Sequence, residues 1–165
     1  TIQYDVVPEF LKTGVFAPRP SVRTLSNAMD VGNPSNFKRM LDLYGSTWNI
    51  LKENIMGYAV SDPSTLDTIL SCFQEYHYLL DPHGAVGLKA WTECRNGFGD
   101  RVNHVGVVLE TAHPIKFSEV IQQVLSDDIP FPDPIKGIME KPMVQTTSFE
   151  VSYTDLKEYL SSSFA

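Results

Sequence analysis

The stretch HVGVVLE, His104 to Glu110, limits the fold more than any other part of the sequence, because it is nearly continuous in branched apolar residues. Such a run is typical of a β-strand that is covered on both faces, as strands are in a parallel sheet. Weaker strand candidates are YAVS near Tyr58, YLL near Tyr78 and a late edge strand, MVQTTSFEV, at residues 143–151. The sequence therefore predicts several short strands.

Helical patterns separate these strand candidates. Apolar residues recur at i, i+3, i+4 and i+7 in residues 37–44, 66–73 and 117–124, and a last helix is expected at residues 153–161. Helices that alternate with short strands indicate an α/β fold with a mostly parallel sheet flanked by helices. The proline-rich stretch at residues 126–142 is predicted to be an irregular excursion within a single domain.

Composition limits the partners of the chain. The 165 residues carry a net charge of -7 and no run of Lys or Arg, which argues against a nucleic-acid surface and an anionic membrane surface. No apolar stretch is long enough to span a bilayer. We expect Cys72 and Cys94 to be free thiols without a disulfide partner, in a reducing cytoplasm. The first residues resemble no secretion signal and contain no initiator Met, so we expect a chain that begins within a longer protein.

Four of the helical patterns open with a residue that can cap a helix, followed by proline: Asn33-Pro34, Asp62-Pro63, Asp81-Pro82 and His113-Pro114. Asn and Asp accept hydrogen bonds from the free amides of a first turn, and proline at the first helical position loses no bond. These pairs are typical of simple helix initiation. The same geometry also suits ligands, which bind near the carboxyl ends of parallel strands.

Two of these sites place reactive groups beside a predicted strand. In VVLETAHPIKF, Thr111 would lie where the strand ends, so its hydroxyl could bind a ligand or cap the next helix. In LLDPHGAVGLKAW, His83 lies in a first turn, where a surface or packing role competes with catalysis. Gly84 and Gly87 permit a close approach, by another helix or by a ligand. A zinc site is rejected because the spacing of the histidines matches no metal motif.

The residues by themselves predict no reaction, but three blocks resemble a known family. RPSVRTLSNAMDVGNPSNFKRML, YLLDPHGAVGLKA and TAHPIKF are similar, in order and spacing, to the carboxyl-terminal part of bacterial and fungal-type threonine synthase. The resemblance covers nearly the whole chain, from about Tyr4 to the last helix. It implies a pyridoxal-phosphate enzyme of the tryptophan-synthase-β type, a lyase that converts O-phospho-L-homoserine and water to L-threonine and phosphate.

The resemblance also implies roles for particular residues. Thr111 matches the hydroxyl that faces the pyridine nitrogen of the cofactor, and Ala112 and His113 would neighbour it. In the first block, residues near the cofactor or the substrate would be Asn27, Asp30 and Asn33, and His83 would lie in the same vicinity. The polar segment at residues 24–36 would then be both a helix start and part of the wall beside the active site.

One departure from the family limits what this chain does alone. In the family, a lysine in a small-residue-Phe-Lys-Asp context holds the cofactor as a Schiff base, and none of the lysines here has that context. The glycine-rich loop for the cofactor phosphate is absent as well. We therefore expect a carboxyl-terminal fragment that is inactive without the amino-terminal part of the same enzyme. The alternative is a non-catalytic α/β module that binds a phosphorylated metabolite and needs no lysine.

Overall fold

The protein is described by a computed structural model that covers residues 5–98, 105–125, 132–133, 136–137, 140–142, 148, 150 and 152–163. The chain divides into two compact units, residues 1–130 and residues 131–165. The predicted excursion at residues 126–142 lies mostly outside the described residues. The first unit carries the core and the candidate site, and it is described first.

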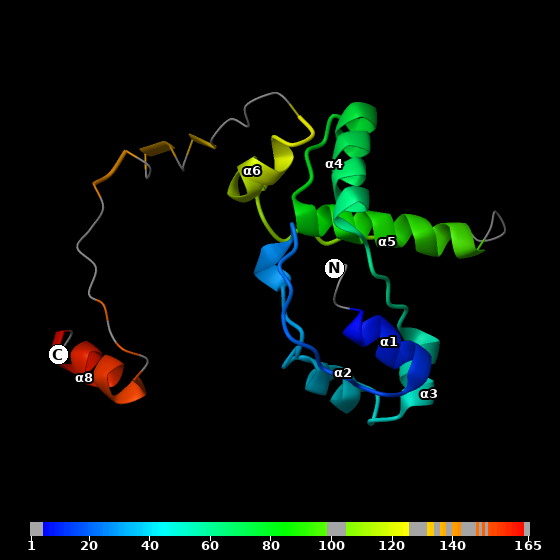
Figure 1. Ribbon diagram of the computed structural model, residues 1–165, viewed down its shortest axis with the longest axis horizontal. Helices are drawn as coiled ribbons and strands as arrows, with labels where there is room; N and C mark the ends of the chain where they lie inside the picture. Colours follow the sequence, from blue (N-terminus) through cyan, green and yellow to red (C-terminus); the bar gives the residue numbers. More distant parts are fainter. Residues whose placement is uncertain are drawn as a thin grey trace. The chain divides into compact units, whose positions relative to one another are not determined.

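Helices form the regular structure of the described part of both units (Figure 1). In the first unit the α-helices are α1 (Val6–Thr13), α2 (Phe37–Leu43), α3 (Trp48–Asn54), α4 (Asp62–Tyr76), α5 (Pro82–Phe98) and α6 (Ser118–Ile121). Two short 3-10 helices are η1 (Asn27–Met29) and η2 (Pro114–Phe117). The second unit contains α8 (Tyr153–Ser163). None of these helices is both long and apolar enough to cross a membrane.

Two apolar clusters hold the first unit together. One joins α1, α2 and α3 through Phe10, Leu11, Phe37 and Leu51, with Phe10 packed edge-on to Phe37 at a centroid distance of 4.8 Å. The other joins α4 and α5 through Ile69, Cys72, Leu80 and Ala85, and these two helices pack directly against each other. The predicted apolar stripes at residues 37–44 and 66–73 are confirmed, because their helices supply Phe37 and Ile69 to these clusters.

The helix starts agree with the cap-proline pattern at two of four positions. Asp81 accepts the backbone N–H of His83 at 2.8 Å before α5, and His113 Nδ1 accepts the N–H of Ile115 at 3.2 Å before η2. At α4 the cap is Ser61, whose hydroxyl accepts the N–H of Ser64, and Asp62 is already inside the helix. At the remaining position, α2 begins only at Phe37, three residues after the predicted proline.

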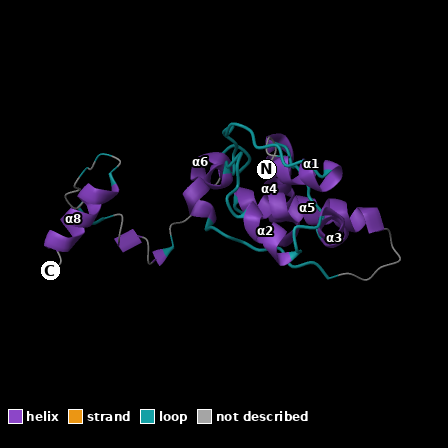
Figure 2. Cartoon of the chain, turned by 90° about the horizontal axis from the view of Figure 1, so that it is seen from below, coloured by secondary structure: helices purple, strands orange, loops and turns teal. Residues whose placement is uncertain are grey.

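The predicted parallel sheet is not found, because the described residues form helices and loops without a strand (Figure 2). Residues 105–110, the described part of the strongest strand candidate, form neither helix nor strand. Val105, Val107 and Leu109 are 89%, 83% and 77% exposed, whereas the prediction had both faces covered. A strand exists only when a neighbouring backbone accepts and donates its hydrogen bonds. Among the described residues nothing supplies that neighbour, so the parallel sheet has no support in this structure.

The other strand candidates do not form strands in the described residues either. YAVS and YLL lie in the loops before α4 and α5. MVQTTSFEV lies mostly outside the described residues. The predicted helix at residues 117–124 is shorter than expected, since η2 and α6 together end at Ile121. The predicted last helix is confirmed and runs from Tyr153 to Ser163.

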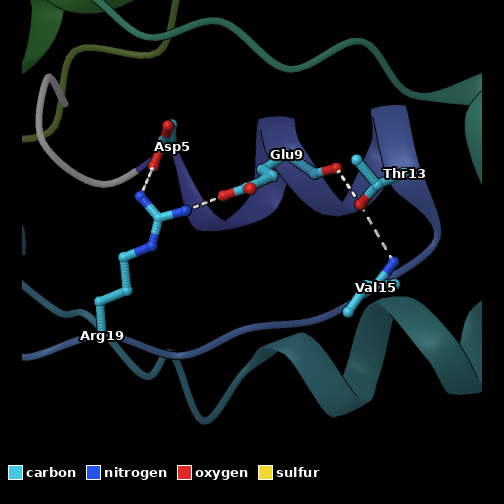
Figure 3. Close-up of polar contacts among 5 residues, drawn as sticks. All are labelled: Asp5, Glu9, Thr13, Val15 and Arg19. Atoms are coloured by element: carbon cyan, nitrogen blue, oxygen red, sulfur yellow. Dashed lines mark hydrogen bonds and ion pairs between the residues drawn. The ribbon is translucent and has the colours of Figure 1, made fainter.

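Arg19 links the loop that follows α1 to that helix (Figure 3). Its guanidinium pairs with Asp5, at 2.8 Å from Oδ1, and with Glu9. The Arg19 backbone N–H also donates to the Gly32 carbonyl at 3.1 Å. A Cβ atom at Gly32 would overlap the Arg19 carbonyl oxygen, so only glycine fits there. These bonds hold residues 24–36 beside the chain that leaves α1.

Candidate functional site

The site begins with the extended segment 105–111, which lies along one face of α5. Every second residue of the segment meets a residue on a single stripe of the helix: Gly106 with Trp91, Val108 with Gly87, and Glu110 with Gly84. A Cβ atom at Gly84 would overlap the Glu110 carboxylate, so the close approach predicted for the α5 glycines is real. The segment therefore has the period-two geometry of a strand with a helix on one side and no strand beside it.

A buried polar cluster lies where this segment crosses the start of α5. Asp81 has no exposed surface, and its Oδ1 accepts the His83 backbone N–H at 2.8 Å and lies 2.7 Å from His83 Nδ1. The Asp81 backbone N–H donates to Glu110 Oε1 at 3.2 Å. The His83 ring packs edge-on against Phe117 of η2, with centroids 5.1 Å apart. The cluster thus links the segment, α5 and η2.

The two carboxyl groups of the cluster have opposite pKa shifts. Burial, and then the neighbouring Asp81 carboxyl, raise the pKa of Glu110 to about 7. Burial alone would raise the pKa of Asp81, but hydrogen bonds from Glu110 and from the amide and ring of His83 outweigh it and lower that pKa. Asp81 Oδ2 and His83 Nε2 are buried and have no hydrogen-bond partner in the described part of the chain. An unpartnered buried polar atom lowers the stability of the folded state, and such atoms often mark functional sites. The cluster is therefore a candidate functional site.

An open groove of about 760 Å³ lies beside the cluster and includes all three residues that the resemblance assigns to the cofactor. Its walls are Tyr78, Leu79, Glu110, Thr111, Ala112, His113, Pro114 and Lys116. Thr111 is exposed, and its hydroxyl has no hydrogen-bond partner among the described residues. The Thr111 hydroxyl is consequently available to a ligand in the groove.

The polar segment at residues 24–36 reaches a second groove, of about 360 Å³, which is also lined by residues of η2 and α6. Asn27 and Arg23 lie in its wall with Lys116, which therefore borders both grooves. Asp30 has a structural task instead, because it accepts the N–H of Thr24 at 2.8 Å and the Thr24 hydroxyl at 2.6 Å. Asn33 is exposed and lines neither groove. The structure thus brings Asn27 toward the site and commits Asp30 to the loop.

Sequence reasoning overlooked the two carboxyl residues of the cluster, Asp81, which is buried, and Glu110, which is exposed. Asp81 was predicted only as a helix cap, and Glu110 only as the end of a strand. The signal that could have exposed Glu110 is Gly84, which leaves room for a group the size of a carboxylate. No group of three or more possible metal-ligating side chains occurs among the described residues.

The sequence and the structure match the same group of known proteins. The family model described as "Threonine synthase, C-terminal" matches residues 84–159. Threonine synthase from Serratia marcescens is 35% identical over 157 residues, which are 94% of this chain and 34% of that protein. The chain is related to the carboxyl-terminal part of threonine synthase. Threonine synthase from Escherichia coli is 34% identical over 140 residues, covering 85% of this chain and 31% of that protein.

Solved threonine synthases also share the fold. The crystal structure of the Escherichia coli enzyme matches with a TM-score of 0.76 and 30% identity, over 98% of this chain and 36% of that chain. A pyridoxal-phosphate-bound threonine synthase from Brucella melitensis matches with a TM-score of 0.70 at 24% identity, which supports the fold alone. The chain spans about a third of the length of the curated relatives it matches.

Proposed function

We propose that this chain is the carboxyl-terminal part of a cytoplasmic threonine synthase, a pyridoxal-phosphate-dependent lyase that forms L-threonine and phosphate from O-phospho-L-homoserine and water. The observation that carries the proposal is the position of Thr111. Thr111 lies at the end of the extended segment and lines an open groove, and its hydroxyl has no hydrogen-bond partner among the described residues. The similarity to threonine synthases along 94% of the chain supports the same activity.

The groove residues fit one side of the cofactor ring. Pyridoxal phosphate, when bound in the intact protein, supplies an electron sink for carbanions on the substrate. The Thr111 hydroxyl can donate a hydrogen bond to the ring nitrogen while leaving that nitrogen without a proton. Ala112 and His113 adjoin it in the groove wall, and His113 also holds η2 in place through its bond to Ile115. The lysine that anchors the cofactor belongs to the amino-terminal part.

The exposed face of the extended segment supports a role for that amino-terminal part. Val105, Val107 and Leu109 point away from α5 and are largely exposed, although α5 covers the alternate residues. A contiguous apolar face of this kind marks an interaction surface. We propose that strands of the amino-terminal part pair with residues 105–111 and complete the parallel sheet. The groove beside Thr111 would gain its opposite wall in the same step.

The test is reconstitution with a separately produced amino-terminal part. Alone, the 165-residue chain should bind pyridoxal phosphate weakly and release no phosphate from O-phospho-L-homoserine. The mixture should release phosphate and show the absorbance of a lysine-linked cofactor. Thr111→Val should lower kcat/KM of the mixture by about tenfold to a hundredfold, because one hydrogen bond to a buried partner is lost. Its far-ultraviolet circular dichroism should not change, because Thr111 is exposed.

Thr154→Val, at an exposed threonine of α8, is the matched control and should leave kcat/KM unchanged. If two well-folded parts associate and no phosphate appears, the proposed activity is wrong. If Thr111→Val has full activity, the proposed activity remains supported but the proposed hydrogen bond from Thr111 to the cofactor is wrong.

A second candidate function is binding of a phosphorylated metabolite without catalysis. The second groove favours it, since Arg23 and Lys116 supply positive charge there, and Asn27 and Ser118 supply hydrogen-bond donors. Calorimetric titration of the chain alone with O-phospho-L-homoserine and with inorganic phosphate separates the two functions. Submillimolar binding that Lys116→Ala abolishes would favour the binding module.

A further inference from the structure

We propose that Glu110, Asp81 and His83 form a proton-sharing cluster in which a neutral Glu110 side chain ties the extended segment to α5 and thereby positions Thr111. Glu110 is then a positioning residue for the groove. The link to Thr111 as a ligand group rests on the proposed function, but the cluster itself does not.

The need for a proton follows from the atoms that meet. The Glu110 carboxyl group lies beside Asp81, since Glu110 Oε1 is 3.2 Å from the Asp81 backbone nitrogen, and each carboxyl group shifts the pKa of the other. Two ionised carboxylates have only acceptors, so a hydrogen bond between the two side chains needs a proton on one of them. Asp81 is fully buried, and Oδ2 has no donor among the amides, hydroxyls and bases of the described chain. A protonated carboxyl group is the donor that this corner of the structure lacks.

The surroundings of the pair decide which carboxyl group carries the proton. Asp81 Oδ1 already receives the amide N–H of His83 and faces the His83 ring, and both interactions favour the ionised form. Glu110 receives only the Asp81 amide and lies against the Gly84 backbone. The proton therefore belongs to Glu110, in agreement with its pKa of about 7.

Other titratable groups near Glu110 come from each packed element. The Cys72 thiol lies on α4, and Glu110 contributes, after burial, to raising the pKa of that thiol. His113 and Lys116 share the groove wall with Glu110 at the start of η2. Both are exposed, so solvent screens them and the buried neighbour Asp81 has the larger effect on Glu110.

The bond has a direct consequence for Thr111, the next residue in the chain. While Glu110 is neutral, its carboxyl group bridges the start of α5 at Asp81 and fills the space left by Gly84. When Glu110 ionises, two negative carboxylates face each other and the bridge weakens. The end of the extended segment, and the Thr111 hydroxyl with it, then loses its attachment to α5.

The sign of the pH effect on stability follows from the two shifts. The raised pKa of Glu110 gives a stabilising contribution that is complete below its ordinary value of 4.5 and lost as the pH rises through about 7. The lowered pKa of Asp81 acts in the opposite sense, with a contribution present above its ordinary value of 3.8 and lost as the pH falls further. The cluster is therefore best formed in mildly acidic solution.

Nuclear magnetic resonance of the complete 165-residue chain tests the cluster directly. With carbon-13 labels in the Glu carboxyl groups, Glu110 should titrate near pH 7, and the Thr111 amide should shift with the same midpoint. In Glu110→Gln, whose neutral amide can still donate to Asp81, the Thr111 amide should be independent of pH through that range. Asp81→Asn should lower the Glu110 midpoint. The control Glu93→Gln, at an exposed α5 residue beside Lys89, should change neither signal.

Two results would overturn the inference. One is a titration midpoint of the Glu110 carboxyl group near 4.5, and the other is a Thr111 amide shift in the parent chain that does not change with pH. If Asp81→Asn does not fold, the comparison of the parent chain with Glu110→Gln still tests the inference. Glu110 is exposed, so this variant should fold.

The reconstituted enzyme supplies the functional readout. From about pH 6 to about pH 8, kcat/KM of the parent should fall by up to about tenfold more than that of Glu110→Gln. Equal profiles would overturn the positioning role. If Glu110 titrates near pH 7 but no activity is recovered, the proposed function is wrong and the proton-sharing cluster is still supported.

Discussion

At the level of single residues, two glycines without a side chain allow other groups to lie directly against their backbone. Gly84 leaves space that the Glu110 carboxylate fills, and Gly32 leaves space for the Arg19 carbonyl. The sequence predicted a close approach at Gly84 but could not say what approaches. Glu110 is 26 positions away in the chain, and no periodic pattern connects residues across a turn between two elements.

The clearest test of the core at this level is Leu51→Ala. Leu51 has no exposed surface and packs with Phe10, Leu11 and Phe37, so the change should lower the free energy of unfolding by about 2–5 kcal/mol. Leu43→Ala, at a leucine that is 77% exposed, should change it by less than about 0.5 kcal/mol. Urea unfolding followed by Trp48 fluorescence measures both. Equal effects of the two changes would contradict the cluster described here.

At the level of elements, the apolar spacing predicted α2, α4 and α8, whereas α1 and α3 were not predicted and the predicted strand was not found. The apolar stripe of α4 fixes which face is buried, and the Ser61 cap and the proline after Asp62 fix where the helix begins. These signals are local. Residues 105–111 have the composition of a buried strand and lie extended on α5, yet a strand also needs a paired backbone that the described chain does not contain.

Val107→Lys tests whether the outer face of this segment is an interface. Val107 is 83% exposed, so the change should alter the free energy of unfolding of the chain by less than about 0.5 kcal/mol. It should nevertheless weaken association with the amino-terminal part at least about tenfold, because a charge would be buried there. Sedimentation of mixtures measures the association. Val15→Lys, at another exposed valine, is the control, and equal losses in both variants would argue against an interface at residues 105–111.

At the level of the whole molecule, the stabilising contacts are distributed unequally. All the buried side chains of the described residues lie at or before Ile121, and α8 buries none. The apolar clusters of the described residues therefore belong to the first unit.

A chain that ends after residue 130 tests this distribution. Since no described side chain of residues 131–165 is buried, its melting temperature should lie within about 4 °C of that of the whole chain. Thermal denaturation followed by circular dichroism at 222 nm is the measurement. A chain that instead starts at residue 15 lacks α1, with Phe10 and Leu11, and should lose its cooperative transition. A large drop on removing residues 131–165 would show that the second unit stabilises the first.

The sequence by itself determined the helices with strong apolar stripes, the caps at Asp81 and His113, and the similarity to threonine synthase. Each of these depends on spacing within one segment or on a block of neighbouring residues. Only the tertiary structure decided that Glu110 meets Asp81 and His83, that Asp30 is bound by Thr24, and that residues 105–111 have no strand beside them. Such features depend on which distant segments share a surface, because burial, hydrogen bonding and pKa shifts arise between segments rather than within them.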